Sequence, residues 1–345
     1  MIRVTGRRRA PPRQSLFFEE AIVKPIDVTG VTVATVLPFD DSGEIDWAGY
    51  RNVLEYCATP TDGAVFINGH AGEGAMLTRE ERLKVIEHTR DFIRPGRLIM
   101  SGVISYGAVD AIAQARDALS AGSDIAVIFP SPLFAAGGAA TPDVPLAFVR
   151  AVADAIDAPL SIFQYPLSSG CGYTTETLAA MALIPNVVAI KEGSDTMTAY
   201  EDTWRQVKAA NPKVAILASN YDWLMPQLVV GADGILSGLA NLVPHMLMEL
   251  WRAAKARDLD AMRAAGDRLY PIVRVIYAKP RMDMHTRIKA GLKGLGVIRS
   301  AMSRSPLLPA SDSAAAAVAA AMEQAGAGGQ AAPPAFVSPR PRNNQ

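Results

Sequence analysis

The feature that most constrains the fold is a regular alternation of short apolar runs with amphipathic segments. It repeats about eight times between residue 31 and the helical segment after Pro244. Strictly alternating strand–helix pairs favour a parallel sheet with helices outside it, and eight pairs fit a closed barrel. The alternative is an open, doubly wound sheet, but no Gly-x-Gly-x-x-Gly turn follows the first run. We therefore expect an α/β chain folded as a (β/α)8 TIM barrel with additional C-terminal helices.

The apolar runs and the residues that interrupt them predict where each element lies. The expected strands are 31–37, 64–67, 98–101, 125–129, 160–163, 187–190, 214–217 and 234–236. The expected helices are 46–58, a segment opened at 78, then 109–120, 145–156, 174–181, 197–209, 223–230 and a segment after 244. Thr78 and Glu81 have the spacing of a capping box, which marks the start of a helix.

Four segments are expected along the chain. Residues 1–28 are rich in Arg and Pro and form a partly flexible extension, and residues 29–245 form the barrel. Between 246 and 300, apolar residues such as Leu250 and Leu269 recur at helical spacing. They predict two or three further helices that pack on the barrel or on a partner subunit. Residues 301–345 are rich in Ala, Gly and Pro and are expected to be mostly disordered, apart from a helical turn or two at 314–324.

The charge balance excludes several classes of function. Lys plus Arg and Asp plus Glu both number 34, so the net charge is zero, which argues against a nucleic-acid-binding protein or a polybasic membrane protein. No apolar run has membrane-spanning length, and the basic N-terminal segment lacks the apolar core of a signal peptide. We therefore expect a cytoplasmic protein.

No metal site is expected. The two cysteines, Cys57 and Cys171, form neither a disulfide framework nor a metal-type cluster. Asp283 and His285 lie close together in the C-terminal segment, but they lack further ligands. We interpret this pair as part of a helix surface or of a subunit contact.

One lysine stands at the end of an apolar run. Residues 187–190 are Val-Val-Ala-Ile, and Lys191 follows them directly. A lysine inside a barrel loses the hydration that favours its charged form, so its pKa falls. The neutral amine is the nucleophile that forms a Schiff base with a ketone. The alternative interpretation is a lysine that marks where the strand leaves the core for solvent.

The chemistry of a barrel of this kind belongs at the carboxyl ends of its strands. Lys191 then points into the barrel from the sixth strand. The loops expected around it are 68–74, 164–170, 219–220 and 237–241. Asn220 and Ser237 are candidates to bind a substrate at this mouth.

Four short motifs follow one another in a fixed order. They are Gly30-Val-x-Val-Ala with Pro38-Phe39 and Asp41-x-Gly43-x-Ile45-Asp46; Gly69-x-x-Gly72-Glu73 with Leu77-Thr78-x-Glu80-Glu81-Arg82; Pro185-Asn-Val-Val-Ala-Ile-Lys191-Glu; and Gly231-Ala-Asp-Gly234-x-x-Ser237 with Asn241-x-x-Pro244. Together they resemble the dihydrodipicolinate synthase / N-acetylneuraminate lyase family of class I Schiff-base aldolases, of which the chain looks like a divergent member.

The resemblance implies a reaction class and an assembly. It implies that Lys191 forms an imine with a 2-oxo acid, and that the chain forms a homotetramer or homodimer. The expected partner is a small-molecule 2-oxo acid or sugar acid, without nucleic acid or membrane. Because the imine itself is the electron sink, neither a metal nor an organic cofactor is expected.

The chain departs from the family at the end of the fifth strand. The family carries Tyr-Asn-Val-Pro there, with the tyrosine as acid/base. Aligned on Pro166, this chain has Phe163 at the tyrosine and Gln164 at the asparagine, and a phenyl ring transfers no proton. Tyr165 is the candidate replacement if the strand bends or bulges; the alternative is a structural tyrosine on the loop. Ser168 stands where the synthase has an arginine that contacts a dicarboxylic ligand.

The loop after the second strand also departs from the family. The family's paired threonines, one in the proton relay and one at the substrate carboxylate, fall on His70 and Ala71. An imidazole titrates near neutrality, so His70 is the expected acid/base; the alternative is a loop histidine bonded to a carbonyl. Backbone N–H groups from Gly69 through Gly72 to Glu73 would still hold a carboxylate. Glu73 itself is expected to be a structural hydrogen-bond acceptor.

These residues predict a Schiff-base-forming lyase that acts on a 2-oxo acid. The reaction is either a pyruvate-type aldol cleavage or the dehydration of a 2-keto-3-deoxy sugar acid, since both begin from the same imine. The 4-hydroxy-tetrahydrodipicolinate synthase reaction is disfavoured because Phe163 and Ser168 replace the tyrosine and arginine. The alternative from another class is a non-catalytic barrel that binds a 2-oxo acid.

Overall fold

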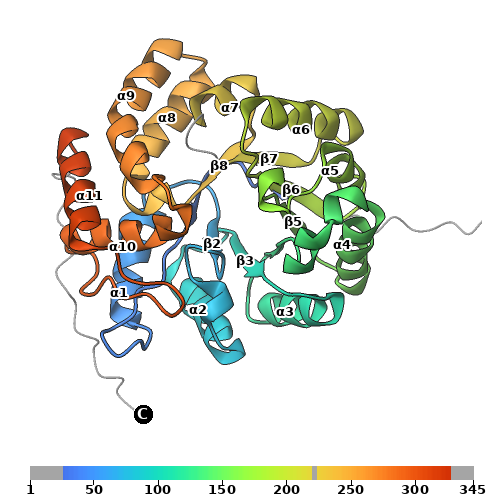
Figure 1. The fold of residues 1–345 in the computed structure, drawn as a ribbon, viewed down its shortest axis with the longest axis horizontal. Coiled ribbons are helices and arrows are strands. Elements are labelled where there is room, and N and C mark those ends of the chain that lie inside the picture. Colours follow the sequence, from blue (N-terminus) through green and yellow to red (C-terminus); the bar gives the residue numbers. More distant parts are fainter. Residues whose placement is uncertain (1–25, 220–223, 328–345) are drawn as a thin grey trace, which may run out of the picture.

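The computed structural model describes residues 26–219 and 224–327. Eight parallel strands follow one another around a closed barrel, and the first pairs with the last (Figure 1). The strands are β1 Gly30–Ala34, β2 Val65–Ile67, β3 Ile99–Val103, β4 Ile125–Ile128, β5 Leu160–Phe163, β6 Val187–Glu192, β7 Ala215–Ala218 and β8 Gly234–Ser237. The predicted (β/α)8 barrel is confirmed, and the bounds of its strands differ from the expected ones by a few residues.

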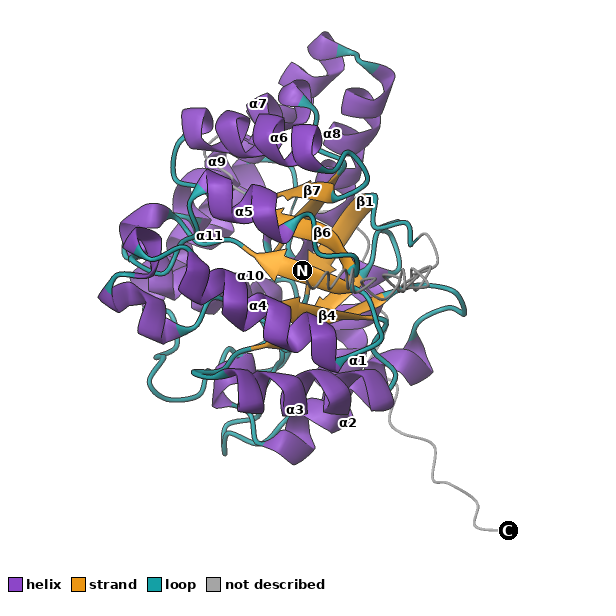
Figure 2. Cartoon of the chain, turned by 90° about the vertical axis from the view of Figure 1, so that its right-hand side faces the viewer, coloured by secondary structure: helices purple, strands orange, loops and turns teal. Residues whose placement is uncertain are grey.

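Helices enclose the strands, as Figure 2 shows from the side. The barrel helices are α1 Trp47–Val53, α2 Arg79–Phe92, α3 Ala108–Ser120, α4 Asp143–Ala155, α5 Thr175–Met181, α6 Met197–Ala210, α7 Leu224–Val230 and α8 Pro244–Ala256. Helix α1 continues as a π-helical turn at Leu54–Ala58, and short 3-10 turns lie at Gly74–Met76, Pro132–Ala136, Gly138–Ala140, Leu167–Ser169, Leu239–Asn241 and Arg281–Asp283. The predicted capping box opens α2: Glu81 N donates to Thr78 Oγ1 at 3.2 Å, and Thr78 N donates to Glu81 Oε2 at 2.9 Å.

The strands are buried on both faces. Every residue of β1 and of β4 is buried, because helices cover the outer face of the sheet and side chains fill the inside of the barrel. The same packing explains why the strands were recognisable as continuous apolar runs. The charged residues Lys191 and Glu192 stand out at the end of β6.

Further helices follow the barrel, as predicted. They are α9 Leu259–Ile276, α10 Met284–Gly294 and α11 Asp312–Gln324. Helix α9 packs on α8, and α11 packs on α9 and α10, so this extension covers one side of the barrel (Figure 1). The last barrel helix runs to Ala256, so the barrel extends beyond the boundary expected at residue 245.

Helix α11 departs from the prediction for residues 301–345, of which the structure describes those up to 327. An ordered helix of 13 residues occupies a stretch for which only a helical turn or two, at 314–324, was expected. Val318 and Met322 are buried, and Val318 Cγ1 lies within 3.0 Å of where a Cβ would stand on Gly291 of α10. Tertiary packing therefore supplies the stability that the Ala-rich composition alone does not indicate.

Candidate active site

A pocket of about 530 Å³ lies at the carboxyl ends of the strands. Its lining includes these residues that the sequence predicted for the site: His70, Ala71, Glu73, Phe163, Gln164, Tyr165 and Lys191. The C-terminal extension adds Tyr277, Arg281, Met282, Met284, His285 and Leu307. This volume is typical of small-molecule sites, and the lining joins segments that are far apart in the sequence.

Lys191 reaches this pocket from β6. It pairs in register with Phe163 of β5, and its Nζ lies 4.1 Å from the centroid of the Phe163 ring. Burial lowers the pKa of the Lys191 amine to about 8, while the Glu192 carboxylate acts in the opposite direction. At pH 7.4 such a pKa leaves roughly one amine in five neutral and nucleophilic.

The two residues after Lys191 leave its amine unobstructed. Glu192 is on the opposite face of the strand, where it is fully buried and accepts a hydrogen bond from Ser194 N at 3.1 Å. A Cβ at Gly193 would lie 3.0 Å from Lys191 Nζ and 2.4 Å from the carbonyl oxygen of Gln164. Glycine at 193 therefore keeps open the space beside the amine.

His70 and Tyr165 form a hydrogen-bonded pair in the pocket. His70 Nε2 and Tyr165 Oη are the bonded atoms, although the two residues are 95 positions apart in the chain. Burial raises the pKa of the Tyr165 hydroxyl, so it stays protonated and can donate. Desolvation by the surrounding protein, and secondarily the Lys191 charge, lower the pKa of His70 to about 4, although the side chain stays exposed along the pocket. The imidazole is therefore a neutral acceptor at physiological pH, which corrects the expectation of a group that titrates near neutrality.

Aromatic rings surround this pair. Phe129 and Phe163 stack with ring centroids 4.0 Å apart, and His70 meets both rings edge-on at 5.0 and 5.6 Å. The Tyr165 ring lies 5.1 Å from that of Phe163. Such contacts hold the relay atoms in place, and the apolar rings also supply the desolvation that lowers the pKa of His70.

The loop of residues 69–73 presents backbone donors to the pocket. The N–H groups of Glu73 and Gly74 are used inside the loop, donating to the carbonyl oxygens of His70 at 3.1 Å and of Gly69 at 3.0 Å. The N–H groups of His70 and Ala71 have no acceptor among the described residues, and both residues line the pocket. They are therefore available to a substrate carboxylate.

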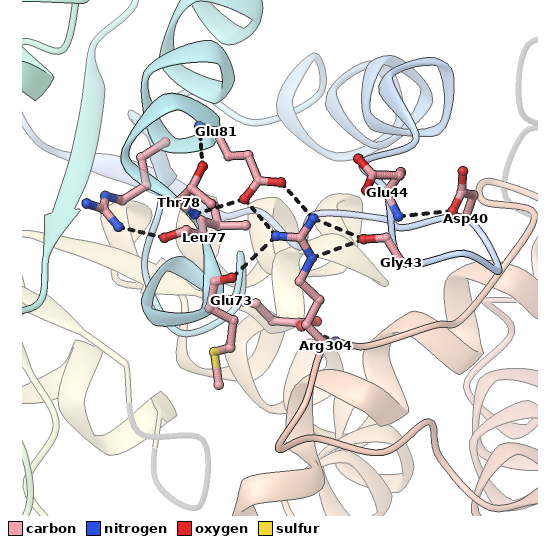
Figure 3. Close-up of polar contacts among 10 residues, drawn as sticks. Asp40, Gly43, Glu44, Glu73, Leu77, Thr78, Glu81 and Arg304 are labelled. Atoms are coloured by element: carbon pink, nitrogen blue, oxygen red, sulfur yellow. Dashed lines mark hydrogen bonds and ion pairs between the residues drawn. The ribbon is translucent and has the colours of Figure 1, made fainter.

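Glu73 joins this loop to the C-terminal extension. Its carboxylate is completely buried and pairs with Lys289 of α10, which is also completely buried. The other carboxylate oxygen accepts from the backbone N of Arg304 at 2.8 Å. Figure 3 shows how the Arg304 side chain then binds both carboxylate oxygens of Glu81 at 2.7 Å and the carbonyl oxygen of Gly43. These contacts agree with a structural role for Glu73.

The remaining predicted residues contribute less to the pocket. The Gln164 side chain lines it, but its amide bonds the backbone N and O of Tyr173 at 3.0 and 2.8 Å. Ser168 Oγ donates to Asp195 Oδ2 at 2.5 Å, and Ser237 Oγ accepts from Leu239 N at 3.0 Å. The lining of the pocket does not include Ser168, Ser237, Gly69 or Gly72. Asn220 lies outside the described residues.

His285 is a pocket residue that the sequence did not reveal. It was interpreted as a helix surface or subunit contact, yet it lines the pocket with its Nε2 3.8 Å from where a Cβ would stand on Gly238. Burial, followed by the charges of His70 and Lys289, lowers the pKa of His285 to about 3. The sequence alone does not show that α10 lies at the mouth of the barrel, and without that placement His285 cannot be recognised as a pocket residue.

A second cavity, of about 520 Å³, lies at the opposite end of the barrel. Two of its charged side chains are engaged by the protein: Arg97 Nε donates to the carbonyl oxygen of Gly63 at 2.9 Å, and Asp62 accepts from Val31 N at 2.8 Å. We assign it a structural role. Within the described ranges, no group of three metal-binding side chains occurs, and no helix has the length and apolarity to cross a membrane.

The fold and the pocket define a (β/α)8-barrel protein with a half-buried lysine at the end of its sixth strand. The family model described as the dihydrodipicolinate synthetase family matches residues 27–325 of the chain. The chain belongs to this family.

Individual relatives and solved structures agree with this assignment. The 4-hydroxy-tetrahydrodipicolinate synthase of Acidiphilium cryptum (strain JF-5) is 30% identical over 294 residues, which cover 85% of this chain and 97% of the relative. That of Syntrophus aciditrophicus (strain SB) is 29% identical over 270 residues, covering 78% and 89%. The dihydrodipicolinate synthase structure from Agrobacterium tumefaciens str. C58 superposes with a TM-score of 0.76 at 26% identity, covering 87% and 98%. A family member from E. coli K12, solved in complex with pyruvate, shares the fold with a TM-score of 0.79 at 21% identity, covering 86% and 98%.

Proposed function

We propose that this protein is a Schiff-base-forming lyase that acts on a 2-oxo acid through Lys191. The observation that carries the proposal is the Lys191 amine, which has a pKa lowered to about 8 and faces a pocket of small-molecule size. Membership of a family with a pyruvate-bound structure supports the same substrate class.

The neighbouring groups supply a balanced route for aldol cleavage. The neutral amine adds to the C2 carbonyl of the substrate. The carbinolamine oxygen takes one proton from the amine and one from solvent and leaves as water, which gives the protonated imine. Tyr165 Oη takes the proton of the C4 hydroxyl while it passes its own proton to His70 Nε2. The C3–C4 bond breaks, an aldehyde leaves, and the electron pair enters the imine to form an enamine. The proton on His70 then returns through Tyr165 to C3, and water hydrolyses the imine, which releases pyruvate and the Lys191 amine. The N–H groups of His70 and Ala71 hold the carboxylate.

Dehydration of a 2-keto-3-deoxy sugar acid uses the same imine. Tyr165 Oη takes a proton from C3 while it passes its own to His70 Nε2, which gives the enamine, and the same relay then returns a proton to the C4 hydroxyl, which leaves as water. The 4-hydroxy-tetrahydrodipicolinate synthase reaction is less well supported, because Ser168 is bonded to Asp195 and offers no cation for a dicarboxylic ligand. A non-catalytic barrel is the remaining alternative. The hydrogen-bonded pair of His70 and Tyr165 beside the amine favours the enzyme.

Borohydride trapping tests the proposal. We expect that pyruvate followed by sodium borohydride adds one reduced pyruvoyl group, located on Lys191 by peptide mass spectrometry, and that Lys191→Met abolishes the adduct while circular dichroism stays unchanged. Lys208, which is engaged in an ion pair with Asp233 at 2.7 Å, offers a control in Lys208→Met, which keeps the adduct. Folded protein that forms no adduct with pyruvate or any other 2-oxo acid contradicts the proposal.

We also propose that copies of this chain form a homodimer or homotetramer and work in the cytoplasm. The apolar side chains of Tyr106, Val109 and Leu133 are exposed on the loops and the helix that follow β3 and β4. They support association of subunits at the carboxyl ends of these strands. Sedimentation equilibrium measures the assembly.

A further inference from the structure

The outer part of the pocket is apolar. The C-terminal extension contributes the thioethers of Met282 and Met284, the ring of Tyr277 and the side chain of Leu307. The barrel loops contribute Met76 and Pro166. These groups come from segments separate from the strand that carries the nucleophile, so they are positioned to contact the part of a substrate that lies beyond its 2-oxo acid end.

Several polar side chains of the lining are already engaged by the protein. The Glu73 carboxylate bonds Lys289 and the backbone of Arg304, and the Gln164 amide bonds the backbone of Tyr173. Ser219 Oγ donates to the carbonyl oxygen of Glu192 at 2.6 Å. These groups therefore have little hydrogen-bonding capacity left for the hydroxyls of a sugar acid.

The remaining polar side chains of the described lining have other properties. Lys191 is the nucleophile, His70 is bonded to the Tyr165 hydroxyl, and the buried side chain of Tyr277 ends in a further hydroxyl. The pKa of His285 is lowered to about 3, so this imidazole is neutral at physiological pH. Arg281 is the one permanent cation in the described lining, and it lies at an exposed position. A polyhydroxylated substrate would lose its hydration here and gain few matching partners, which costs binding free energy.

We propose that the aldehyde released or taken up by this enzyme carries an apolar group about the size of a phenyl ring. The inference rests on the proposed function, since it assigns the half of the substrate that the imine does not hold. Aromatic rings contact methionine sulfur and other rings favourably, and the pocket of 530 Å³ has room for such a group beside the imine of pyruvate.

The corresponding reaction balances without a further reagent. In the synthetic direction, C3 of the pyruvate enamine attacks the aldehyde carbon, and one C–C bond forms. The aldehyde oxygen takes a proton through Tyr165. Water then hydrolyses the imine, which returns the Lys191 amine and releases a 4-aryl-4-hydroxy-2-oxobutanoate.

The test compares three aldehydes as partners of pyruvate. Benzaldehyde represents the apolar class, D-glyceraldehyde the hydroxylated class, and glyoxylate the class with a second carboxylate that Arg281 would favour. We expect kcat/KM for benzaldehyde to exceed that for each of the others by at least about tenfold, with product identified by mass spectrometry.

Adjacent leucines provide a matched pair of variants. Leu307 lines the pocket, whereas Leu308 is 79% exposed and is not part of the lining. We expect Leu307→Ser to lower kcat/KM for benzaldehyde about tenfold with little change for glyoxylate, and Leu308→Ser to change neither. Equal effects of the two variants on benzaldehyde contradict the assigned role of this wall.

Borohydride trapping with pyruvate alone separates the two levels of the proposal. If the adduct on Lys191 forms but glyceraldehyde or glyoxylate is preferred, or benzaldehyde is not turned over, the apolar substrate class is overturned and the Schiff-base function stands. If no adduct forms, both the Schiff-base function and the apolar substrate class are contradicted.

Discussion

At the scale of single residues, Lys191 combines two opposed influences on one pKa. Burial disfavours the ammonium form, while the adjacent Glu192 carboxylate favours it, and burial is the larger effect. The result is an amine with a pKa of about 8, which is partly neutral in the physiological range.

This balance predicts the pH dependence of imine formation. Because only the neutral amine attacks, the rate constant for adduct formation with pyruvate should rise about tenfold per pH unit well below pH 8 and level off above it. Stopped-flow absorbance measures the profile. Replacing Glu192 by Gln removes the charge that raises this pKa, so the midpoint should move to lower pH. A wild-type midpoint near that of a free lysine would show that the amine is not desolvated.

The pair of His70 and Tyr165 predicts a separation between binding and turnover. Tyr165→Phe and His70→Ala each remove one member of the relay, so turnover should fall about 10²- to 10⁴-fold while borohydride still traps pyruvate on Lys191. Steady-state kinetics and mass spectrometry give the two readouts.

Tyr173→Phe is the matched control for this pair. Tyr173 is buried and lies outside the pocket lining, so removal of its hydroxyl should leave turnover unchanged. Unchanged turnover in Tyr165→Phe would instead return Tyr165 to the alternative of a structural loop tyrosine.

At the scale of elements, the loop after β2 is fixed by contacts on both of its sides. A Cβ at Gly74 would lie 1.9 Å from the carbonyl oxygen of Asn68, so glycine is required where the loop turns back. On its other side, Glu73 is held by Lys289 of α10. The position of His70 therefore depends on an element that comes more than two hundred residues later in the chain.

The buried pair predicts a large and asymmetric effect on stability. Lys289→Met leaves the Glu73 carboxylate buried without its cation and should cost about 3–5 kcal/mol in the free energy of unfolding measured with urea. Adding Glu73→Gln should recover part of this loss, since the uncompensated charge is gone. The exposed pair of Arg205 and Glu201 is the control, and Arg205→Met should cost under about 0.5 kcal/mol. Equal costs for Lys289→Met and Arg205→Met would contradict this account.

Local patterns predicted the elements better than the contacts between them. The apolar run of residues 187–190 and the capping box at Thr78 are signals carried by neighbouring residues, and both the strand and the helix start lie where they were expected. Lys191 was identified in the same way. His285 could not be, because a histidine in an amphipathic helix looks the same whether its face meets solvent or a pocket.

At the scale of the whole molecule, α11 stabilises the C-terminal extension through its packing contacts. It packs on α9 and α10, and α10 in turn carries Lys289 and His285 to the mouth of the barrel. The sequence predicted only a helical turn or two at 314–324 rather than a helix of 13 residues, because the apolar stripe is interrupted by many alanines and gains its stability from the surface it covers.

The packing of α11 predicts unequal effects of two neighbouring substitutions. Val318 is 1% exposed, and Val318→Ser should lower the free energy of unfolding by about 2–4 kcal/mol, since it leaves a cavity and buries a hydroxyl. Ala317 is exposed, so Ala317→Ser should stay within about 0.5 kcal/mol of the wild type. Denaturant unfolding followed by circular dichroism compares them, and similar values for the two variants would show that α11 does not support the fold.

The ion pair between Glu73 and Lys289 also has a consequence for biosynthesis. A ribosome delivers all eight strands once Ser237 has been added, so a closed barrel can form before Lys289 exists. Until Lys289 and Arg304 are made, the carboxylate of Glu73 has no cation and the pocket lacks one wall. A nascent chain can therefore close its barrel early, while its pocket is complete only after residue 307 has been added.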